Sequence, residues 1–209
     1  MKVRPIYALT IAVLLVFAFG QMNHVFASET FSWTYDKINS ATPTKYALSE
    51  AINSTNAKIY NNLVYNTTTT VSKAVIGFWN GSGGSDWHID IVMVKDHTIE
   101  VVLNFPSYLK IANGTWTDGK ITYVTISEDG DLTVKNGDTT ILDDFNIGTF
   151  TVAYVSGSGA PYSVQSGYIS LTISKGSSDT SVIVSQWMPL IITFAMLGVA
   201  LGFIKKYAG

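Results

Sequence analysis

The sequence predicts a mainly β protein, with an antiparallel β-sandwich between two hydrophobic terminal segments. Two observations carry this prediction. Stretches of alternating apolar and polar residues recur between residues 28 and 175, with turn-forming residues roughly every 8 to 12 positions, which is typical of sandwiches of about seven or more strands. Each end of the chain also holds a long stretch without charge, and only 13% of all 209 residues are charged.

The N-terminal segment, residues 1–27, has the features of a secretory signal peptide. Two basic residues precede the apolar stretch 6–19, and small residues place a cleavage point after Ala27. The competing interpretation is an uncleaved anchor, because residues 6–25 are long enough to cross a bilayer.

The C-terminal segment, residues 182–204, predicts a transmembrane helix. It carries no charge, and a helix of about 23 residues is about 34 Å long, enough to cross a bilayer. Within it, Gly198 and Gly202 form a Gly-x-x-x-Gly pair that favours close helix packing. We therefore expect membrane lipids as partners, and a homo-oligomer or other surface proteins.

The flanking charges predict the orientation of the domain. Basic residues stand before the first segment and in the tail 205–209, so the positive-inside rule places residues 28–175 outside the membrane. Residues 176–181 are polar and rich in Ser, as expected of a tether. We expect a membrane-anchored protein with its main domain extracellular or on a virion surface.

Composition excludes several functions. There is no Cys, which excludes disulfides, Cys-ligated metals and thiol catalysis. Residues 28–181 hold nine Lys and 15 acidic residues, a net charge of −6, and the sole Arg is Arg4. Nucleic-acid binding needs a basic face, so we expect no nucleic-acid partner.

Four N-glycosylation sequons lie in the predicted external part, and none lies in the apolar segments. Their acceptors are Asn53, Asn66, Asn80 and Asn113. The set predicts a glycoprotein.

Several strands and one hairpin register follow from alternation. Phe31, Trp33 and Tyr35 alternate with polar residues, and so do the apolar residues of 89–93 and 99–103 around a turn at Asp96-His97. Placing both apolar sets on one face pairs Ile91 with Leu103 and Met93 with Val101. We expect Trp33, Phe78 and Tyr154 between the sheets.

The later part of the chain predicts further strands. Residues 121–127, 132–135 and 138–142 form successive strands, the last two joined by Asn136-Gly137 as a type I′ turn. Residues 150–155 and 168–173 are two more, separated by a flexible loop at 156–161. One helix is predicted over 42–63, because Leu48, Ile52, Ile59 and Leu63 share a helical face.

Two resemblances accompany this pattern. The stretch 123–144, YVTISEDGDLTVKNGDTTILDD, resembles the DGxLxV…NG hairpin of jelly-roll domains of the laminin-G and legume-lectin type, which implies a jelly-roll-like sandwich. The whole layout resembles surface glycoproteins of hyperthermophilic archaea and of their spindle-shaped viruses, including tail and envelope components. This resemblance implies no site residues.

The sequence holds two candidate ion sites. Asp86, His88 and Asp90 share one strand face, with Asn104 as the residue expected opposite, and could hold a metal. A solvent-facing strand surface is polar by default, however, and we favour that interpretation. Asp129, Asp131, Asp143 and Asp144 are candidates for Ca²⁺ ligands. We expect no cofactor.

Catalytic motifs are missing from the sequence. None of the four Glu residues falls in the Glu-x-Asp-x-x-Glu pattern of sandwich glycosidases, and no Gly-x-Ser-x-Gly elbow occurs. We therefore expect no enzyme. Among the aromatic residues, Trp79, Trp87 and Trp116 are candidates for stacking on sugar rings, with core packing as the alternative.

The leading hypothesis is a non-enzymatic structural surface glycoprotein, anchored in a membrane within an extracellular or virion assembly. The alternative is a glycan-binding adhesin or lectin that attaches to host or neighbouring cells through the sandwich.

Overall fold

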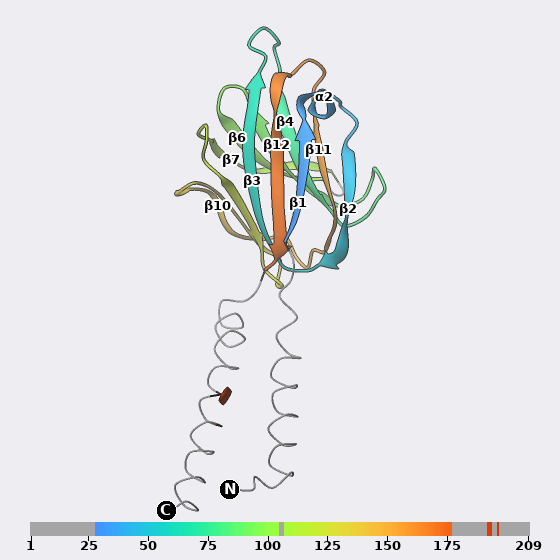
Figure 1. Cartoon of the computed structure of the whole chain (residues 1–209), viewed down its shortest axis with the longest axis vertical. Coiled ribbons are helices and arrows are strands. Elements are labelled where there is room, and N and C mark those ends of the chain that lie inside the picture. Colours follow the sequence, from blue (N-terminus) through green and yellow to red (C-terminus); the bar gives the residue numbers. More distant parts are fainter. Residues whose placement is uncertain (1–27, 105–106, 177–191, 194–195, 197–209) are drawn as a thin grey trace, which may run out of the picture. The chain divides into compact units, whose positions relative to one another are not determined.

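The computed structural model of the chain describes residues 28–104, 107–176, 192–193 and 196 (Figure 1). The chain divides into two compact units, Ser28–Gly176 and the combination of Met1–Ala27 with Ser177–Gly209. In the second unit, residues 192, 193 and 196 are described and are helical.

The predictions for the terminal segments fall mostly on other residues. The N-terminal segment, the tether after residue 176, most of 182–204 with Gly198 and Gly202, and the tail 205–209 lie outside the described residues. Among the residues that are described, none belongs to a helix with the length and apolar character needed to span a bilayer.

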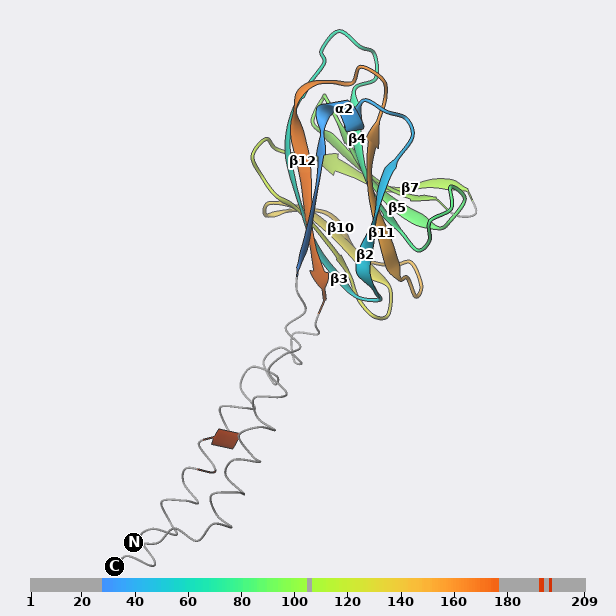
Figure 2. The same cartoon turned by 45° about the vertical axis from the view of Figure 1, so that its right-hand side comes forward.

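The unit Ser28–Gly176 is a sandwich of two six-stranded sheets, visible face to face in Figure 2. The first sheet has the order β1-β12-β3-β8-β9-β10 and the second β2-β11-β4-β5-β6-β7, with antiparallel neighbours throughout. The predicted antiparallel sandwich is thus confirmed. The elements are β1 (Glu29–Thr34), α2 (Tyr35–Ile38), β2 (Thr44–Ile52), β3 (Thr55–Tyr65), β4 (Lys73–Trp79), β5 (His88–Val94), β6 (Thr98–Asn104), β7 (Tyr108–Thr115), β8 (Thr122–Ile126), β9 (Asp131–Asn136), β10 (Thr139–Asn146), β11 (Val152–Gly159) and β12 (Val164–Lys175).

The core lies between the two sheets. It is filled by every second side chain of the strands, because successive residues of a strand point to opposite faces. In β3, Ala57, Ile59 and Leu63 are buried, whereas Lys58 and Tyr60 between them are exposed. The largest fully buried side chains come from both sheets and from the segments that join them: Trp33, Ile38, Ile59, Ile76, Phe78, Ile89, Ile91, Met93, Ile99, Ile126, Leu132 and Phe150. Burial of this apolar surface is the main stabilising contribution to the unit.

Two predicted aromatic positions differ from expectation. Tyr35 does not continue β1 but opens the short helix α2, where it is exposed. Tyr154 is half-buried and pairs with Trp79 on the outer face of the second sheet, rather than lying between the sheets. Trp33 and Phe78 are fully buried, as predicted.

The predicted helix over 42–63 is wrong, because this stretch forms β2, a turn at Asn53-Ser54, and most of β3. The four apolar residues that suggested it are spaced by four within each strand, Leu48 to Ile52 and Ile59 to Leu63. A spacing of four fits both the helical period and twice the strand period. Pairing of β3 with β12 and β8 over its length decides for the strand.

The β5–β6 hairpin forms as predicted, with its register displaced by two residues. Ile91 pairs with Val101 and Met93 with Ile99, whereas Leu103 pairs with Ile89. A two-residue displacement keeps every side chain on its face, so alternation alone could not detect it. The turn fixes the register, with His97 at φ 67° and its N–H donating to the Val94 carbonyl at 3.0 Å.

The predicted strands around residues 121–142 are confirmed as β8, β9 and β10. The predicted type I′ turn is misplaced by one residue. Asn136 pairs with Thr139, so the turn residues are Gly137 and Asp138, and of these only Gly137 has positive φ, at 56°. This pattern corresponds to a type II′ turn, which also matches the twist of the hairpin.

The predicted flexible loop at 156–161 is wrong over its first part, because Ser156–Gly159 continue β11 between β2 and β4. Gly157 faces the ring of Trp33, and a Cβ added there would lie 2.4 Å from Trp33 Cγ. A glycine is required for this close approach, so Gly here marks packing rather than flexibility.

Candidate ligand-binding site

The outer face of the second sheet carries a row of polar and aromatic side chains on adjacent strands. Tyr154 on β11 pairs with Trp79 on β4, which pairs with His88 on β5. His88 pairs in turn with Asn104 on β6, and Asn104 pairs with Tyr108 on β7. Antiparallel pairing thus brings five residues from separate parts of the sequence to one level of the sheet.

A pocket of about 290 Å³ opens at this row. Tyr108 is 63% exposed, so its ring is available at the edge of the pocket. The residues that line the pocket offer a carboxylate, an imidazole, an amide and three hydroxyls, and they are Gly84, Ser85, Asp86, His88, Asn104, Ser107 and Tyr108.

His88 is held from two sides. Its Nδ1 lies 2.7 Å from the backbone carbonyl of Asp86, and because a carbonyl only accepts, Nδ1 carries the proton of this hydrogen bond. Its Nε2 lies 3.7 Å from Asp90 Oδ2. The same Oδ2 accepts a hydrogen bond from Asn104 Nδ2 at 2.9 Å. The two pocket-lining residues His88 and Asn104 therefore meet at one carboxyl oxygen beneath the pocket.

Trp79 forms the inner wall behind His88. Its indole N–H donates to Ser156 Oγ at 2.7 Å, and Lys45 Nζ lies 3.3 Å from its ring centroid. Gly77 leaves the space for this arrangement, because a Cβ there would come within 2.5 Å of Trp79 Nε1 and 2.6 Å of Ser156 Oγ. The indole of Trp79 can thus reach Ser156 across the sheet, and it is buried there.

The protonation of the site follows from its burial. Desolvation raises the pKa of Asp90 to about 7, against the opposing effects of the Asn104 hydrogen bond and of Lys73. Desolvation also lowers the pKa of His88, and the positive charge of Lys45 acts in the same direction. Asp90 is thus the group of this site whose protonation changes around neutral pH.

The structure brings together the polar residues that alternation had placed on one strand face. Asn104 lies opposite His88, as predicted. In the part of the chain that the structure describes, no three His, Asp or Glu side chains gather as a metal site would require. In the structure, Asp86, His88 and Asp90 each take part in hydrogen bonds.

Of the three tryptophans considered for stacking on sugars, Trp79 and Trp116 are buried. Trp79 and Trp116 are each 4% exposed, and Trp87 is half-buried with its ring edge against Phe150. An indole in such a position does not offer its face to a ligand. Tyr108 is instead the exposed ring at the pocket, and the sequence held no signal for it, because its exposure follows from its position at the start of the edge strand β7.

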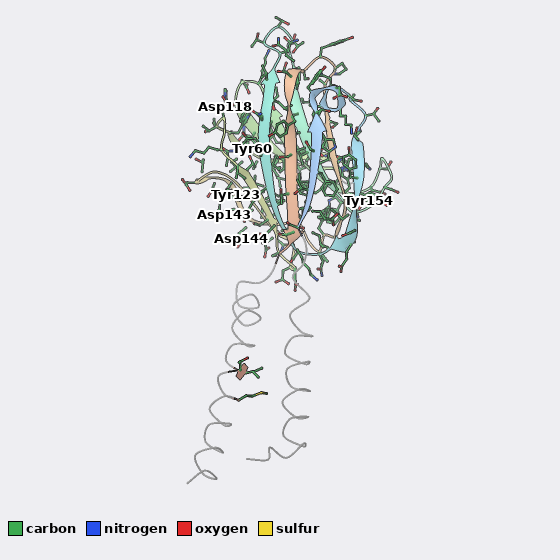
Figure 3. The ribbon with its side chains drawn as sticks, viewed as in Figure 1. Tyr60, Asp118, Tyr123, Asp143, Asp144 and Tyr154 are labelled. Atoms are coloured by element: carbon green, nitrogen blue, oxygen red, sulfur yellow. The ribbon has the colours of Figure 1, made fainter. Side chains whose placement is uncertain are left out.

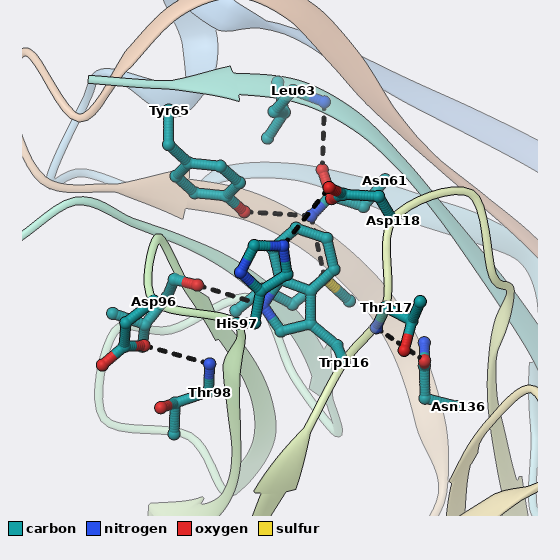
Figure 4. A network of polar contacts seen from close by, with 12 residues as sticks. Asn61, Leu63, Tyr65, Asp96, His97, Thr98, Trp116, Thr117, Asp118 and Asn136 are labelled. Carbon is teal, nitrogen blue, oxygen red and sulfur yellow. Dashed lines mark hydrogen bonds and ion pairs between the residues drawn. The ribbon is translucent and has the colours of Figure 1, made fainter. Parts of the chain in front are cut away.

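Trp116 belongs to a second cluster (Figure 4). This cluster lies at the Val94 end of β5, whereas His88 is at the other end of that strand. His97 stacks on Trp116 with ring centroids 4.8 Å apart, and His97 Nε2 lies 3.2 Å from Asp118 Oδ2. The indole N–H of Trp116 donates to the Val94 carbonyl at 3.0 Å. His97 and Asp118 are exposed, and the cluster fastens the β5–β6 turn to the segment after β7.

The four acidic residues considered for Ca²⁺ do not form one site. Asp129 and Asp131 flank the β8–β9 turn, where Asn146 Nδ2 donates to the Asp129 carbonyl at 3.1 Å and to Asp131 Oδ1 at 2.7 Å. Asp143 and Asp144 lie exposed on β10 (Figure 3). These contacts tie β10 to the turn through hydrogen bonds.

The sequon asparagines differ in their surroundings. Asn80 and Asn113 are exposed, in the β4–β5 loop and on the edge strand β7. Asn53 is exposed too, but Thr55 of its sequon is buried, with no hydrogen-bond partner for Oγ1 among the described atoms. Asn66 is half-buried and uses both ends of its amide, donating to the Tyr162 carbonyl at 3.2 Å and accepting from the Thr68 N–H at 3.0 Å.

Comparisons with known proteins identify no family. No protein-family model and no curated sequence matches the chain. Among solved structures, the chain is similar to sheep galectin-11 in complex with glycerol, at 12% identity and a TM-score of 0.44, over 62% of this chain and 96% of that one. It is also similar to the CBM40 of the Ruminococcus gnavus IT-sialidase bound to α2,6-sialyllactose, at 16% identity and 0.44, over 68% and 92%.

A third similar structure is the β-fructofuranosidase of Schwanniomyces occidentalis complexed with fructosyl-erythritol, at 11% identity and a TM-score of 0.47, over 73% of this chain and 34% of that one. With similarities this distant, the chemistry of the pocket has to be judged from its own residues.

Proposed function

We propose that the sandwich binds a saccharide in the pocket on the outer face of its second sheet. The observation that carries the proposal is the convergence of Asp86, His88 and Asn104 in a pocket beside the exposed ring of Tyr108. A sugar presents several hydroxyls, which both donate and accept, and a less polar ring face. Carboxylate, imidazole and amide groups match the hydroxyls, and an aromatic ring matches the ring face.

The size of the pocket limits the ligand. About 290 Å³ is at the small end of ligand pockets, which span roughly 300–1,000 Å³. We therefore propose that it takes one sugar residue at the end of a glycan, with the rest of the glycan outside the pocket. Contacts this few imply weak binding by one copy, strengthened where several copies act together.

The sequence supports a cell-surface or virion setting for this activity. The apolar segments 6–19 and 182–204 and the four sequons are typical of a membrane-anchored glycoprotein with its domain outside. The first and last strands are neighbours, with Glu29 paired to Ile173, so the chain enters and leaves the sandwich at one end. In this proposal the protein attaches its bearer, an archaeal cell or an archaeal virus, to glycans of a host or neighbour.

A structural subunit of a surface coat or of a virion envelope or tail is the second candidate. The observation that favours it lies on the first sheet, where Tyr60 and Tyr123 are exposed (Figure 3). Tyr168 on the same sheet is exposed too, and its ring centroid lies 6.2 Å from that of Tyr60. Exposed aromatic side chains are typical of interfaces. A defined oligomer of the detergent-solubilised full chain that the change Tyr60→Ser dissociates would support this function.

A glycan array probed with the detergent-solubilised full chain tests saccharide binding. We expect signals from a few glycans that share one terminal residue, and their loss in the variant Asn104→Ala. Absence of any signal, also when the chain is clustered on beads to raise its avidity, would contradict the proposal.

A further inference from the structure

Asp90 lies beneath the pocket and contacts two of the residues that line it, His88 on its own strand β5 and Asn104 on the neighbouring strand β6. Its Oδ2 accepts from Asn104 Nδ2 at 2.9 Å and lies 3.7 Å from His88 Nε2. Its own side chain is 19% exposed and does not line the pocket. Asp90 is therefore placed to act on a ligand through Asn104 and His88, without touching it.

The groups that face Asp90 are few. Its cross-strand neighbours are Gly77 and Val102, which have no charge, so the carboxyl lies in a poorly solvated position. A charge acts on it from the neighbouring strand β4, where Lys73 lowers the pKa of Asp90. The burial of Asp90 has the larger effect and raises this pKa to about 7.

Further charges on this face are already engaged. Lys45 on β2 lies over Trp79, and its Nζ donates to the Gly83 carbonyl at 2.8 Å. Glu100 on β6 is paired with Lys110 on β7 at 2.5 Å. Asp86 accepts a hydrogen bond from the backbone N–H of Gly83. His88 is thus the titratable group closest to the carboxyl of Asp90.

We propose that Asp90 is the positioning residue of the saccharide pocket, and that proton uptake by its carboxyl group releases Asn104 and weakens saccharide binding. This inference rests on the proposed function. When Asp90 is ionised, the hydrogen bond from Asn104 is charge-assisted and roughly twice as strong as a neutral one. It fixes the amide plane and leaves Asn104 Oδ1 and the second N–H for the hydroxyls of a sugar.

Protonation at Asp90 or at its neighbour His88 changes one of two pocket-lining residues, Asn104 or His88. The proton taken up by the pair lies on Asp90 or on His88 Nε2, since these atoms face each other. On Asp90, it weakens the bond from Asn104. On His88, it removes the lone pair that Nε2 offers to a sugar hydroxyl, because Nδ1 already holds a proton for the Asp86 carbonyl. Either location lowers the affinity as the pH falls.

Two measurements on the detergent-solubilised full chain test the inference. The first follows the Asn104 side-chain amide by NMR between about pH 8.5 and pH 5.5, with no ligand. The second titrates the methyl glycosides of glucose, galactose and mannose over the same range. We expect the amide signal to shift with a midpoint near the Asp90 value of about 7. We expect the affinity of the best glycoside to fall roughly threefold to tenfold on acidification.

Variants separate Asp90 from general effects of pH. Asp90→Asn should remove the pH dependence of both readouts, and Lys73→Met should move the midpoint upward, because Lys73 lowers the pKa of Asp90. Asp118→Asn is the matched control, as it alters the other His–Asp pair, at the opposite end of β5. It should leave both readouts as in the wild type.

The outcomes distinguish this inference from the proposed function. An unchanged pH profile in Asp90→Asn, or a glycoside affinity that does not vary with pH, would overturn the inference while leaving saccharide binding in place. Should no glycoside bind at any pH while the Asn104 amide shifts in the wild type but not in Asp90→Asn, the proposed function fails and the coupling of Asp90 to Asn104 stands.

Discussion

The indole ring of Trp79 lies against the imidazole ring of His88, with centroids 3.5 Å apart and planes 14° apart. The stack fixes the plane of His88 at the wall of the pocket. The stack also covers Trp79. The indole that the sequence suggested for stacking on a sugar therefore supports the pocket residue His88 instead.

Replacing the exposed ring at the pocket should weaken saccharide binding. We expect Tyr108→Ala to lower the affinity for the best glycan of the array roughly tenfold, since the sugar loses its aromatic contact. The matched control is Tyr123→Ala, which removes an exposed tyrosine from the first sheet. Isothermal titration of the solubilised chain measures both. Equal affinities for the two variants would refute a role for Tyr108.

Filling the space beneath the indole should destabilise the sandwich. In Gly77→Ala the new methyl group would lie 2.5 Å from Trp79 Nε1 and 3.0 Å from Asp90 Oδ1, so the outer face must shift. We expect a loss of about 1–3 kcal/mol in the free energy of unfolding. Gly84→Ala is the control, because nothing lies within 4 Å of its Cβ position. Chemical denaturation that found both variants equally stable would contradict this packing.

Stability should depend on pH through Asp90. Burial raises the pKa of Asp90 to about 7, so the stability that its proton contributes is present at low pH and lost as the pH rises through about 7. Burial lowers the pKa of His88, which acts oppositely and reduces stability as the pH falls below about 6.5.

Between about pH 8 and pH 6.5 the gain from Asp90 should outweigh the smaller loss from His88, so the wild type should gain less than about 1 kcal/mol in the free energy of unfolding. Asp90→Asn should show no such gain, since its amide does not titrate. Denaturant titrations of both proteins across this range provide the measurement, and a parallel gain in the variant would assign the effect to other groups.

Trp116 should matter for stability and not for sugar binding. It is 4% exposed, stacks on His97, contacts the Tyr65 ring at a tilt, and donates to the Val94 carbonyl. We expect Trp116→Ala to lower the free energy of unfolding by about 3–5 kcal/mol. Titration of the variant with the best glycan, at a temperature where it stays folded, should give the wild-type affinity. A specific loss of affinity at that temperature would show that Trp116 contributes to sugar binding.

The sequons should differ in occupancy. We expect glycans on Asn80 and Asn113, whose side chains are exposed, and lower occupancy at Asn66, whose amide is hydrogen-bonded at both ends. Mass spectrometry of peptides from the native source gives the occupancy of each site. Full occupancy of Asn66 would show that glycans are attached before the loop folds.

Local alternation was sufficient for much of the fold. It identified the hairpins of β5–β6 and β8–β9–β10, and it placed His88 and Asp90 on one strand face. It failed where two periods coincide, as at Leu48 and Ile52, and where a shift of two residues preserves the face, as for Ile91. Those choices depend on partners distant in the chain.

The sequence by itself determined which residues are apolar, where the chain turns, and that polar side chains line one face of a strand near His88. Only the tertiary structure decided what that face does. Pairing across β4, β5, β6 and β7 placed Asn104 and Tyr108 beside His88, and the missing side chain of Gly77 allowed Trp79 to be covered. The charge of Asp90 was decided there as well, because desolvation is a property of the packed neighbourhood and not of the residue.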